Sequence, residues 1–121
     1  MPRTDLTVQT IGRVTALQDP TRYTPDVANG NSFNNASTRV FLYFTNSNAG
    51  TCTVTVAYPG NVDTDLAVPD RTYAIPTGER WLVGPFTTSY NQEDNSLTNR
   101  VLFNCDISAS VTVEVLYLPA A

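Results

Sequence analysis

The stretch D-T-D-L-A-V-P-D-R-T-Y-A-I-P-T-G-E-R-W-L-V-G-P-F, residues Asp63–Phe86, decides the fold of this chain. Two runs that read as strands, Arg71–Ile75 and Arg80–Val83, flank the turn sequence P-T-G-E at positions 76–79. Proline suits an early turn position because its φ is fixed, and glycine can take the positive φ that a tight turn needs. The pattern predicts a β-hairpin in the middle of an all-β domain.

Strands are predicted on the N-terminal side of this hairpin as well. Residues Asp5–Leu17 alternate imperfectly, and the slip of phase near Gly12 predicts an early strand with a bulge or bend. Arg39–Thr45 is apolar on both faces, which predicts a central strand covered on both sides. Thr51–Tyr58 alternates cleanly, so we expect one buried and one wet face. The short Asn/Gly turn between the last two strands predicts a second hairpin.

Two further strands, Arg100–Ile107 and Ser110–Leu118, complete the chain. In the last strand Leu116 and Leu118 lie opposite a face of valines, which predicts that its later half is covered on both sides. The 121 residues suit one domain. The whole pattern predicts a single all-β domain over residues 1–121, a two-sheet β-sandwich or jelly roll of about seven or eight strands.

A long polar segment, Gln18–Ser37, separates the early strand from the rest and is predicted to be a loop. Loops of this length usually bind something or wrap a neighbour. Its isolated apolar residues Tyr23, Val27 and Phe33 are expected to pin it to the body of the domain or to a partner. A second polar segment, residues 87–99, is predicted to be an exposed loop that carries Tyr90.

Composition excludes several functions. The chain has no lysine and no histidine, a net charge of −4 and a charged fraction of only 15%. The arginines are scattered, whereas binding to nucleic acid needs a basic patch. The absence of histidine removes the commonest general base and metal ligand. No apolar run reaches membrane-spanning length and no signal peptide opens the chain, so we expect a product that folds in the cytoplasm where it is made.

Cys52 and Cys105 each alternate in phase with apolar neighbours, which predicts that both point into the core. Two interpretations remain open. Buried free thiols are expected in a reducing compartment. A disulfide between facing sheets is the alternative, and it would contribute about 4 kcal/mol in the chain-entropy model.

No catalytic signature is present, and the protein is predicted to be neither an enzyme nor dependent on a metal or cofactor. Asp63, Asp65 and Asp70 could supply oxygens to calcium, but aspartate is equally suited to turns because its side chain bonds nearby backbone. Glu93 and Asp94 lie in the second polar loop and could form an acid pair with that cluster.

A carbohydrate-binding module is the rival prediction. Sugar sites need exposed aromatic rings, with polar side chains beside them. Trp81 and Tyr90 are the candidates for this site, and Tyr23 is a further ring placed in a polar loop. For Trp81 the alternative is a place in or beside the core.

The run L-A-V-P-D-R-T-Y-A-I-P-T-G-E-R-W-L-V-G-P-F, Leu66–Phe86, resembles a group of small proteins from tailed bacteriophages and prophages. In that group a G/D-L-A-V-x-D-R-T-V-x-V-P-A-G-x-x-x-x-I-G-P-F stretch lies in the same relative place. The start R-T-D-L-T-V-Q-T-I-G-R and the N-G-N-S-F-N-N loop at Asn29–Asn35 also look like their counterparts. The resemblance covers most of the chain, which departs from the pattern at Tyr73, Trp81 and its two cysteines.

The resemblance implies a capsid decoration (cement) protein with a β-sandwich or jelly-roll fold, commonly trimeric, on the outer capsid shell. The partners it implies are the major capsid protein and further copies of the chain, with a homotrimer favoured. No nucleic acid or membrane is expected as a partner. The expected location is the capsid surface of the virion, after synthesis in the host cytoplasm. Capsid contacts are predicted from the N-terminal arm (residues 1–5) and the long loop: Met1, Pro2, Arg3, Thr4, Asp5, Tyr23, Val27 and Phe33.

Overall fold

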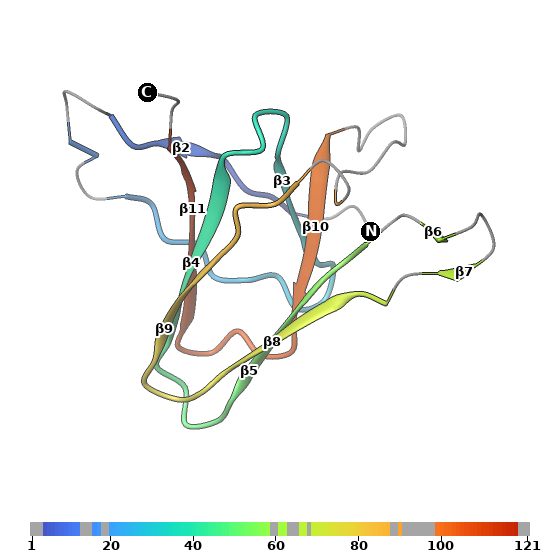
Figure 1. Ribbon diagram of the computed structural model, residues 1–121. Helices are drawn as coiled ribbons and strands as arrows, with labels where there is room; N and C mark the ends of the chain where they lie inside the picture. Colours follow the sequence, from blue (N-terminus) through green and yellow to red (C-terminus); the bar gives the residue numbers. More distant parts are fainter. Residues whose placement is uncertain are drawn as a thin grey trace.

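The computed structural model describes residues 4–12, 16–17, 20–58, 61–62, 66–67, 69–87, 90 and 99–118. Over these ranges the chain forms β-strands and no α-helix (Figure 1). The strands are β1 (Thr4–Asp5), β2 (Gln9–Thr10), β3 (Asn31–Asn34), β4 (Val40–Asn46), β5 (Cys52–Val56), β6 (Asn61–Val62), β7 (Leu66–Ala67), β8 (Arg71–Ile75), β9 (Arg80–Val83), β10 (Arg100–Cys105) and β11 (Val111–Tyr117).

Nine of these strands form two packed sheets, which confirms the predicted single-domain β-sandwich. One sheet has the order β1-β3-β10-β5-β8 and the other has the order β2-β11-β4-β9, while β6 pairs with β7. From β3 onward the chain changes sheet at most connections, and β5 and β8 are neighbours in the same sheet.

The core lies between the sheets and is filled by the inward face of each strand. In β5 the sequence C-T-V-T-V buries its cysteine and valines and leaves its threonines half-buried, as the alternation predicts. Each fully buried side chain of this kind stabilises the fold by roughly 1.5–3 kcal/mol relative to exposure. The largest fully buried side chains are Phe33, Phe44, Phe103, Leu42, Ile75, Val40, Val54, Val56, Val101, Val111, Val113 and Val115.

The two strands of the opening stretch form with the predicted bounds, but they do not pair with each other. β8 pairs with β5 in one sheet, and β9 pairs with β4 in the other. The turn between them therefore crosses from sheet to sheet, with Gly78 at a φ of +80°. The predicted hairpin is wrong because turn residues specify a reversal of direction and not the strand partner. Ile75 and Val83 both point into the core, from opposite sheets.

The second predicted hairpin is wrong for the same reason, since β4 and β5 belong to different sheets. The β10–β11 connection also crosses, and Figure 1 places all three crossing turns at one end of the sandwich. Asn46, at the end of β4, holds this end together although it is only 1% exposed. Its side-chain amide donates to the carbonyl oxygens of Gly50 (3.0 Å) and Ile75 (2.9 Å). Its backbone oxygen accepts from Gly78 N–H at 2.7 Å.

The segment 18–37, predicted as a loop, contains strand β3. β3 pairs antiparallel with β10, and Phe33 stands opposite Val101. The side chain of Phe33 is 0% exposed and lies in the core. It therefore fixes the segment to the body of the domain and is not a surface contact, so its prediction as a capsid anchor is wrong. The polar residues around it masked a strand of only four residues.

The early strand predicted over Asp5–Leu17 is also divided between the sheets. β1 pairs parallel with β3, and β2 pairs parallel with β11 in the facing sheet. Leu6 lies between them and is 2% exposed, so the chain crosses the edge of the sandwich there with a buried anchor. Thr4 and Asp5, predicted to belong to an N-terminal arm of residues 1–5, are consequently part of a sheet. Residues 1–3 lie outside the described part of the chain.

Candidate functional site

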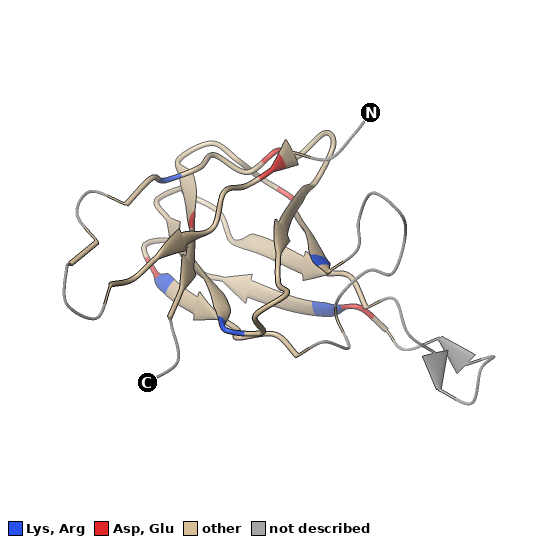
Figure 2. Ribbon diagram, turned by 90° about the horizontal axis from the view of Figure 1, so that it is seen from above, with Lys and Arg blue, Asp and Glu red and all other residues tan. Residues whose placement is uncertain are grey.

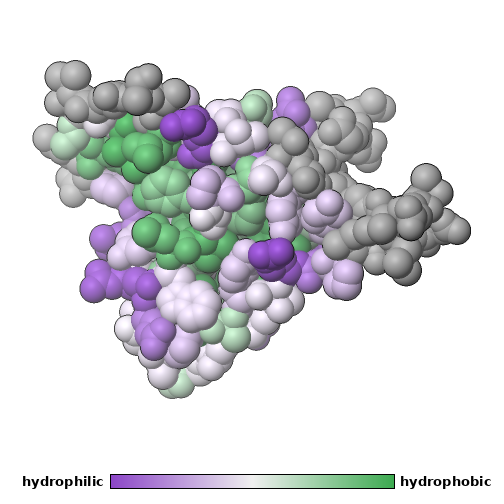
Figure 3. All heavy atoms as spheres, viewed as in Figure 1, coloured by the Kyte–Doolittle hydropathy of each residue, from purple (hydrophilic) through white to green (hydrophobic). Residues whose placement is uncertain are grey.

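The outer face of the four-stranded sheet carries an unusual amount of apolar surface. Across this face Tyr43 stands opposite Leu82, and Phe41 opposite Leu116. Leu82 is 66% exposed and Leu118 is 50% exposed. Figure 3 shows hydrophobic side chains gathered over β9, β4 and β11. The prediction that β4 is covered on both sides is wrong, because Phe41 and Tyr43 are only half-buried.

A groove of about 400 Å³ crosses this face at the end where β9 and β11 finish. Arg39 forms part of its wall and its Nε donates to the carbonyl oxygen of Leu118 at 3.0 Å. This bond fixes the guanidinium beside the apolar floor. The lining residues are Thr38, Arg39, Phe41, Leu82, Gly84, Pro85 and Leu118. The groove therefore offers an apolar floor with a cationic rim, which suits a protein surface better than a small polar ligand.

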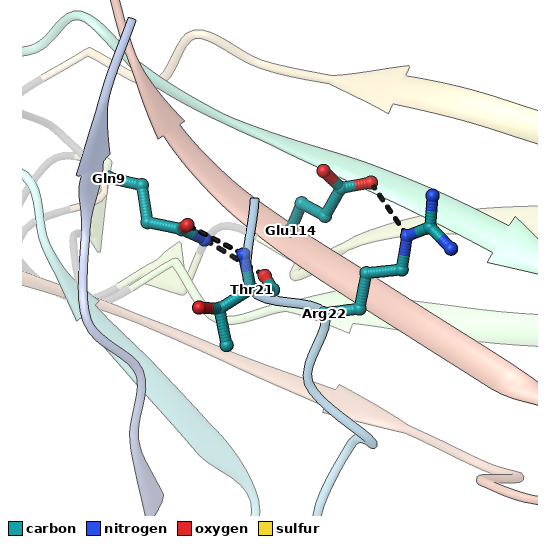
Figure 4. Close-up of polar contacts among 4 residues, drawn as sticks. All are labelled: Gln9, Thr21, Arg22 and Glu114. Carbon is teal, nitrogen blue, oxygen red and sulfur yellow. Dashed lines mark hydrogen bonds and ion pairs between the residues drawn. The ribbon is translucent and has the colours of Figure 1, made fainter. Parts of the chain in front are cut away.

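The charges on this face, among the described residues, are mainly positive. Arg80 is exposed on β9, where it stands opposite Thr45 of β4. The carboxylate of Glu114 is 6% exposed and lies 3.7 Å from Nε of Arg22 (Figure 4). Because Glu114 is paired, Arg39, which lines the groove, determines the sign of the potential there.

The free edge of β11 is closed by the segment that carries Arg22. Backbone N–H and C=O groups of Tyr23 and Val113 exchange two hydrogen bonds of 2.8 Å. The side chain of Gln9 forms two hydrogen bonds with the backbone of Thr21, an arrangement called here the Gln9 clasp (Figure 4). The N–H of Thr21 donates to Gln9 Oε1 at 2.7 Å, and Gln9 Nε2 donates to the carbonyl oxygen of Thr21 at 2.8 Å. Tyr23 is half-buried as a result. It pins the segment to the domain, which is one of the two roles predicted for it.

A second surface forms where the N-terminal strand meets the turn before β3. Thr4 N–H donates to the oxygen of Gly30 at 3.0 Å, and Thr4 Oγ1 donates to Asp26 Oδ2 at 2.6 Å. The Thr4 hydroxyl, followed by the N–H of Asn29, lowers the pKa of the Asp26 carboxyl. Val27, at the tip of this turn, is 45% exposed.

The structure thus brings together part of the predicted capsid contact. Thr4 and Asp5 are exposed beside the Val27 turn, and Asp5 forms an ion pair with Arg100. Tyr23 is half-buried at the facing sheet and Phe33 is buried, so neither adds to this surface. Met1, Pro2 and Arg3 lie outside the described residues.

The two rings predicted for sugar binding do not share a site. Trp81 is half-buried against the core, and its Nε1 donates to Glu79 at 2.9 Å. Tyr90 is packed edge-on against Tyr58 (5.2 Å between ring centroids) and Phe86 (5.6 Å). Tyr90 lines a separate cavity of about 430 Å³ together with Arg71, Tyr73, Gly84, Pro85, Phe86 and Thr87.

The cysteines are free thiols, and both are buried. A disulfide between facing sheets is wrong as a prediction, because β5 and β10 are neighbours in one sheet. The thiols of Cys52 and Cys105 contact each other, and desolvation raises the pKa of each above its ordinary value.

The predicted calcium cluster is only partly within the described residues, because Asp63 and Asp65 fall outside them. The carboxylate of Asp70 accepts the N–H of Tyr58 at 3.0 Å, so it bonds the backbone of a segment twelve residues earlier and not that of its own turn. Glu93 and Asp94 also lie outside the described part of the chain. In that part, no group of three or more metal-ligating side chains comes together, and no helix could span a membrane.

Sequence reasoning missed Leu82 and Leu118 as surface residues. Leu82 lies in the four-residue strand β9, which is too short to show which face is exposed. β11 is buried on both faces at Glu114–Leu116, as predicted, but Leu118 just beyond it is exposed. Comparison of the chain with protein-family models, curated proteins and solved structures gives no match. The function has to be inferred from the surfaces themselves.

Proposed function

We propose that this protein is a non-enzymatic structural component of a bacteriophage virion that decorates the outer surface of the capsid and stabilises it. Its partners are the major capsid protein and further copies of the chain, with a trimer as the favoured assembly. The N-terminal arm makes the capsid contact.

The observation that carries this proposal is the pairing of β1 with β3. Thr4 stands opposite Asn31, and Asp5 opposite Ser32. These two strands come from the N-terminal and Asn29–Asn35 segments that resemble phage proteins. Segments that are distant in sequence thus lie side by side at one sheet edge.

A decoration protein acts by burying area across capsid subunits, and it needs no chemistry of its own. Each contact can be weak, because many copies on one shell add through multivalency. A contact of standard size buries about 800 Å² on each partner. A folded β-sandwich loses less conformational entropy on binding than an unfolded segment does, which favours such a contact.

Removal of Met1–Arg3 tests the role of the arm. We expect the truncated protein to keep its thermal unfolding midpoint, since β1 begins at Thr4, and to cosediment with expanded capsids much less than the full chain. Thr72→Ala, on the exposed face of β8, is the matched control and should cosediment as the unchanged protein does. Full retention of the truncated chain on capsids would contradict the assignment of the arm.

The cavity beside Tyr90 favours a second candidate function, a carbohydrate-binding module on the virion. Tyr73 and Tyr90 offer aromatic rings and Arg71 offers hydrogen-bond donors around one cavity. This candidate predicts retention on a glycan array that Tyr90→Ala abolishes without unfolding the domain. Trp81→Ala, outside the cavity lining, should leave that retention intact.

A further inference from the structure

We propose that copies of this protein associate head to tail, with the Val27 turn of one copy seated in the Leu82–Leu118 groove of the next. The contact does not depend on capsid binding and goes beyond it. It assigns Val27, which the sequence suggested as a capsid contact, to the surface between copies.

The exposed apolar side chains of the domain support this contact. Among the described residues, the large hydrophobic side chains that stand exposed are Val27, Leu82 and Leu118. Two of them line one groove, and the third projects from a turn elsewhere on the chain. A concave apolar surface and a convex apolar side chain are complementary in shape. The contiguous apolar lining of the groove, with Phe41, Leu82, Pro85 and Leu118 together, is the kind of surface that another protein covers.

The charges beside the groove and beside the Val27 turn favour a contact of turn against groove. Arg39 lines the groove and Arg80 lies two residues before Leu82 on β9, whereas Asp26 directly precedes Val27. Asp5 is already paired with Arg100, so the unpaired negative charge beside Val27 is that of Asp26. The Asp26 carboxylate is held in the turn by bonds from Thr4 and Asn29. A contact of groove against groove would bring the arginines of both copies together, which is unfavourable. The acidic turn therefore fits the cationic groove better than a second groove does.

The Val27 turn and the Leu82–Leu118 groove lie on opposite sides of the sandwich. The turn leads into β3 of the five-stranded sheet, and the groove lies on the outer face of the four-stranded sheet. In Figure 2 the acidic positions beside the N-terminal strand and the arginines nearest the C-terminal end are on different sides. One copy can thus engage two neighbours at once. Such a contact is heterologous and closes into a ring or continues as a chain.

Sedimentation velocity on the purified full-length protein tests the proposal. We expect the unchanged chain to form species larger than a dimer as its concentration rises. The groove variant, Leu82→Asp combined with Leu118→Asp, replaces the apolar side chains of the groove by charges. The turn variant, Val27→Asp, replaces the apolar side chain at the tip of the Val27 turn. Each variant should associate more than about tenfold more weakly than the unchanged chain, because a buried apolar contact is lost and a charge is buried in its place. Circular dichroism on heating checks that both variants remain folded.

The mixture of the two variants gives the sharpest result. The groove variant keeps an intact Val27 turn, and the turn variant keeps an intact groove. An equimolar mixture should therefore form a one-to-one heterodimer and nothing larger. Thr72→Asp adds a charge at an exposed position on β8 and should leave association unchanged.

Three results would overturn the proposal: a monomeric unchanged chain, normal association of Val27→Asp, or a mixture that yields no heterodimer. Because no capsid is present in the experiment, its failure counts against the favoured trimer but leaves the proposed binding to the capsid intact. Failure of capsid binding likewise leaves the head-to-tail contact intact.

Discussion

At the scale of single residues, the ring of Phe33 shows how closely the two sheets are joined. It lies 5.8 Å from the ring centroid of Phe86 and 6.1 Å from that of Phe103. The ring of Phe103 in turn meets Phe44 of the facing sheet edge-on at 5.8 Å. Such aromatic contacts add about 0.5–1.5 kcal/mol each beyond the burial of apolar area.

Truncation of this ring should therefore destabilise the fold strongly. We expect Phe33→Ala to lower the free energy of unfolding by about 3–5 kcal/mol, because it leaves a cavity in the core. Urea denaturation measures this change. Val27→Ala, in the same segment but exposed, should change the free energy by less than about 0.5 kcal/mol. Equal effects of the two substitutions would contradict the placement of β3.

Asn46 is the buried polar residue on which the crossing turns depend. Its replacement by alanine leaves the buried carbonyl of Ile75 without its donor, so we expect a loss of about 2–4 kcal/mol. Asn34→Ala serves as the control, since Asn34 is exposed and its side chain accepts one bond, from Ala36 N–H. Chemical denaturation of both variants decides the matter, and a loss below about 1 kcal/mol for Asn46→Ala would speak against its role.

The buried thiols make stability depend on alkaline pH. Burial raises the pKa of Cys52 and Cys105 in the folded state, so the unfolded chain releases their protons first as the pH rises. The free energy of unfolding should therefore decline above about pH 8.5, the ordinary thiol pKa. Denaturation under reducing conditions at pH 7 and pH 9.5 measures the decline. The double variant Cys52→Ala/Cys105→Ala should show a smaller decline, and an identical one would exclude the thiols as its cause.

At the scale of strands, the sequence was sufficient to locate most elements but not to pair them. Arg71–Ile75 and Arg80–Val83 have the predicted bounds because their alternation and turn residues are local features. Their partners β5 and β4 depend on which apolar faces meet across the core, and that is a long-range property. The two-residue strands β1 and β2 are too short to show a period, so they could not be recognised.

The same limit explains what was predicted of the surfaces. Val27, Thr4 and Asp5 were recognised as exposed because they lie in polar sequence. Leu82 and Leu118 were not, because an apolar second face of a strand has the same pattern whether a layer of the same chain or another molecule covers it. The packing of the two sheets is needed to show that, among the described residues, no further segment covers the outer face of the β4–β9 strand pair.

The Gln9 clasp is a property of the β11 edge and can be tested there. Gln9→Ala removes both bonds to Thr21, so we expect a loss of about 0.5–1.5 kcal/mol and faster hydrogen exchange of the Thr21 amide. Gln9→Glu keeps the acceptor for that amide and should protect it better than alanine does. If exchange at Thr21 is the same in all three proteins, the clasp does not hold the edge.

At the scale of the whole molecule, the sandwich is a rigid body with distinct surfaces on different sides. We propose that the turn beside β1 and the groove over β4 serve contacts between copies, and that residues 1–3 contact the capsid. A ring of copies would present several arms to one shell, and weak single contacts would then add to firm attachment. The low charge of the chain, with a net value of −4, limits repulsion between neighbours on the shell.

The proposal that this protein decorates a capsid is tested most directly by quantitative mass spectrometry of purified virions. The measured quantity is the ratio of this chain to the major capsid protein. A decoration protein should occur in a fixed stoichiometric ratio that persists through further purification. Absence from the virion, or a trace amount that falls with each purification step, would contradict the proposed function.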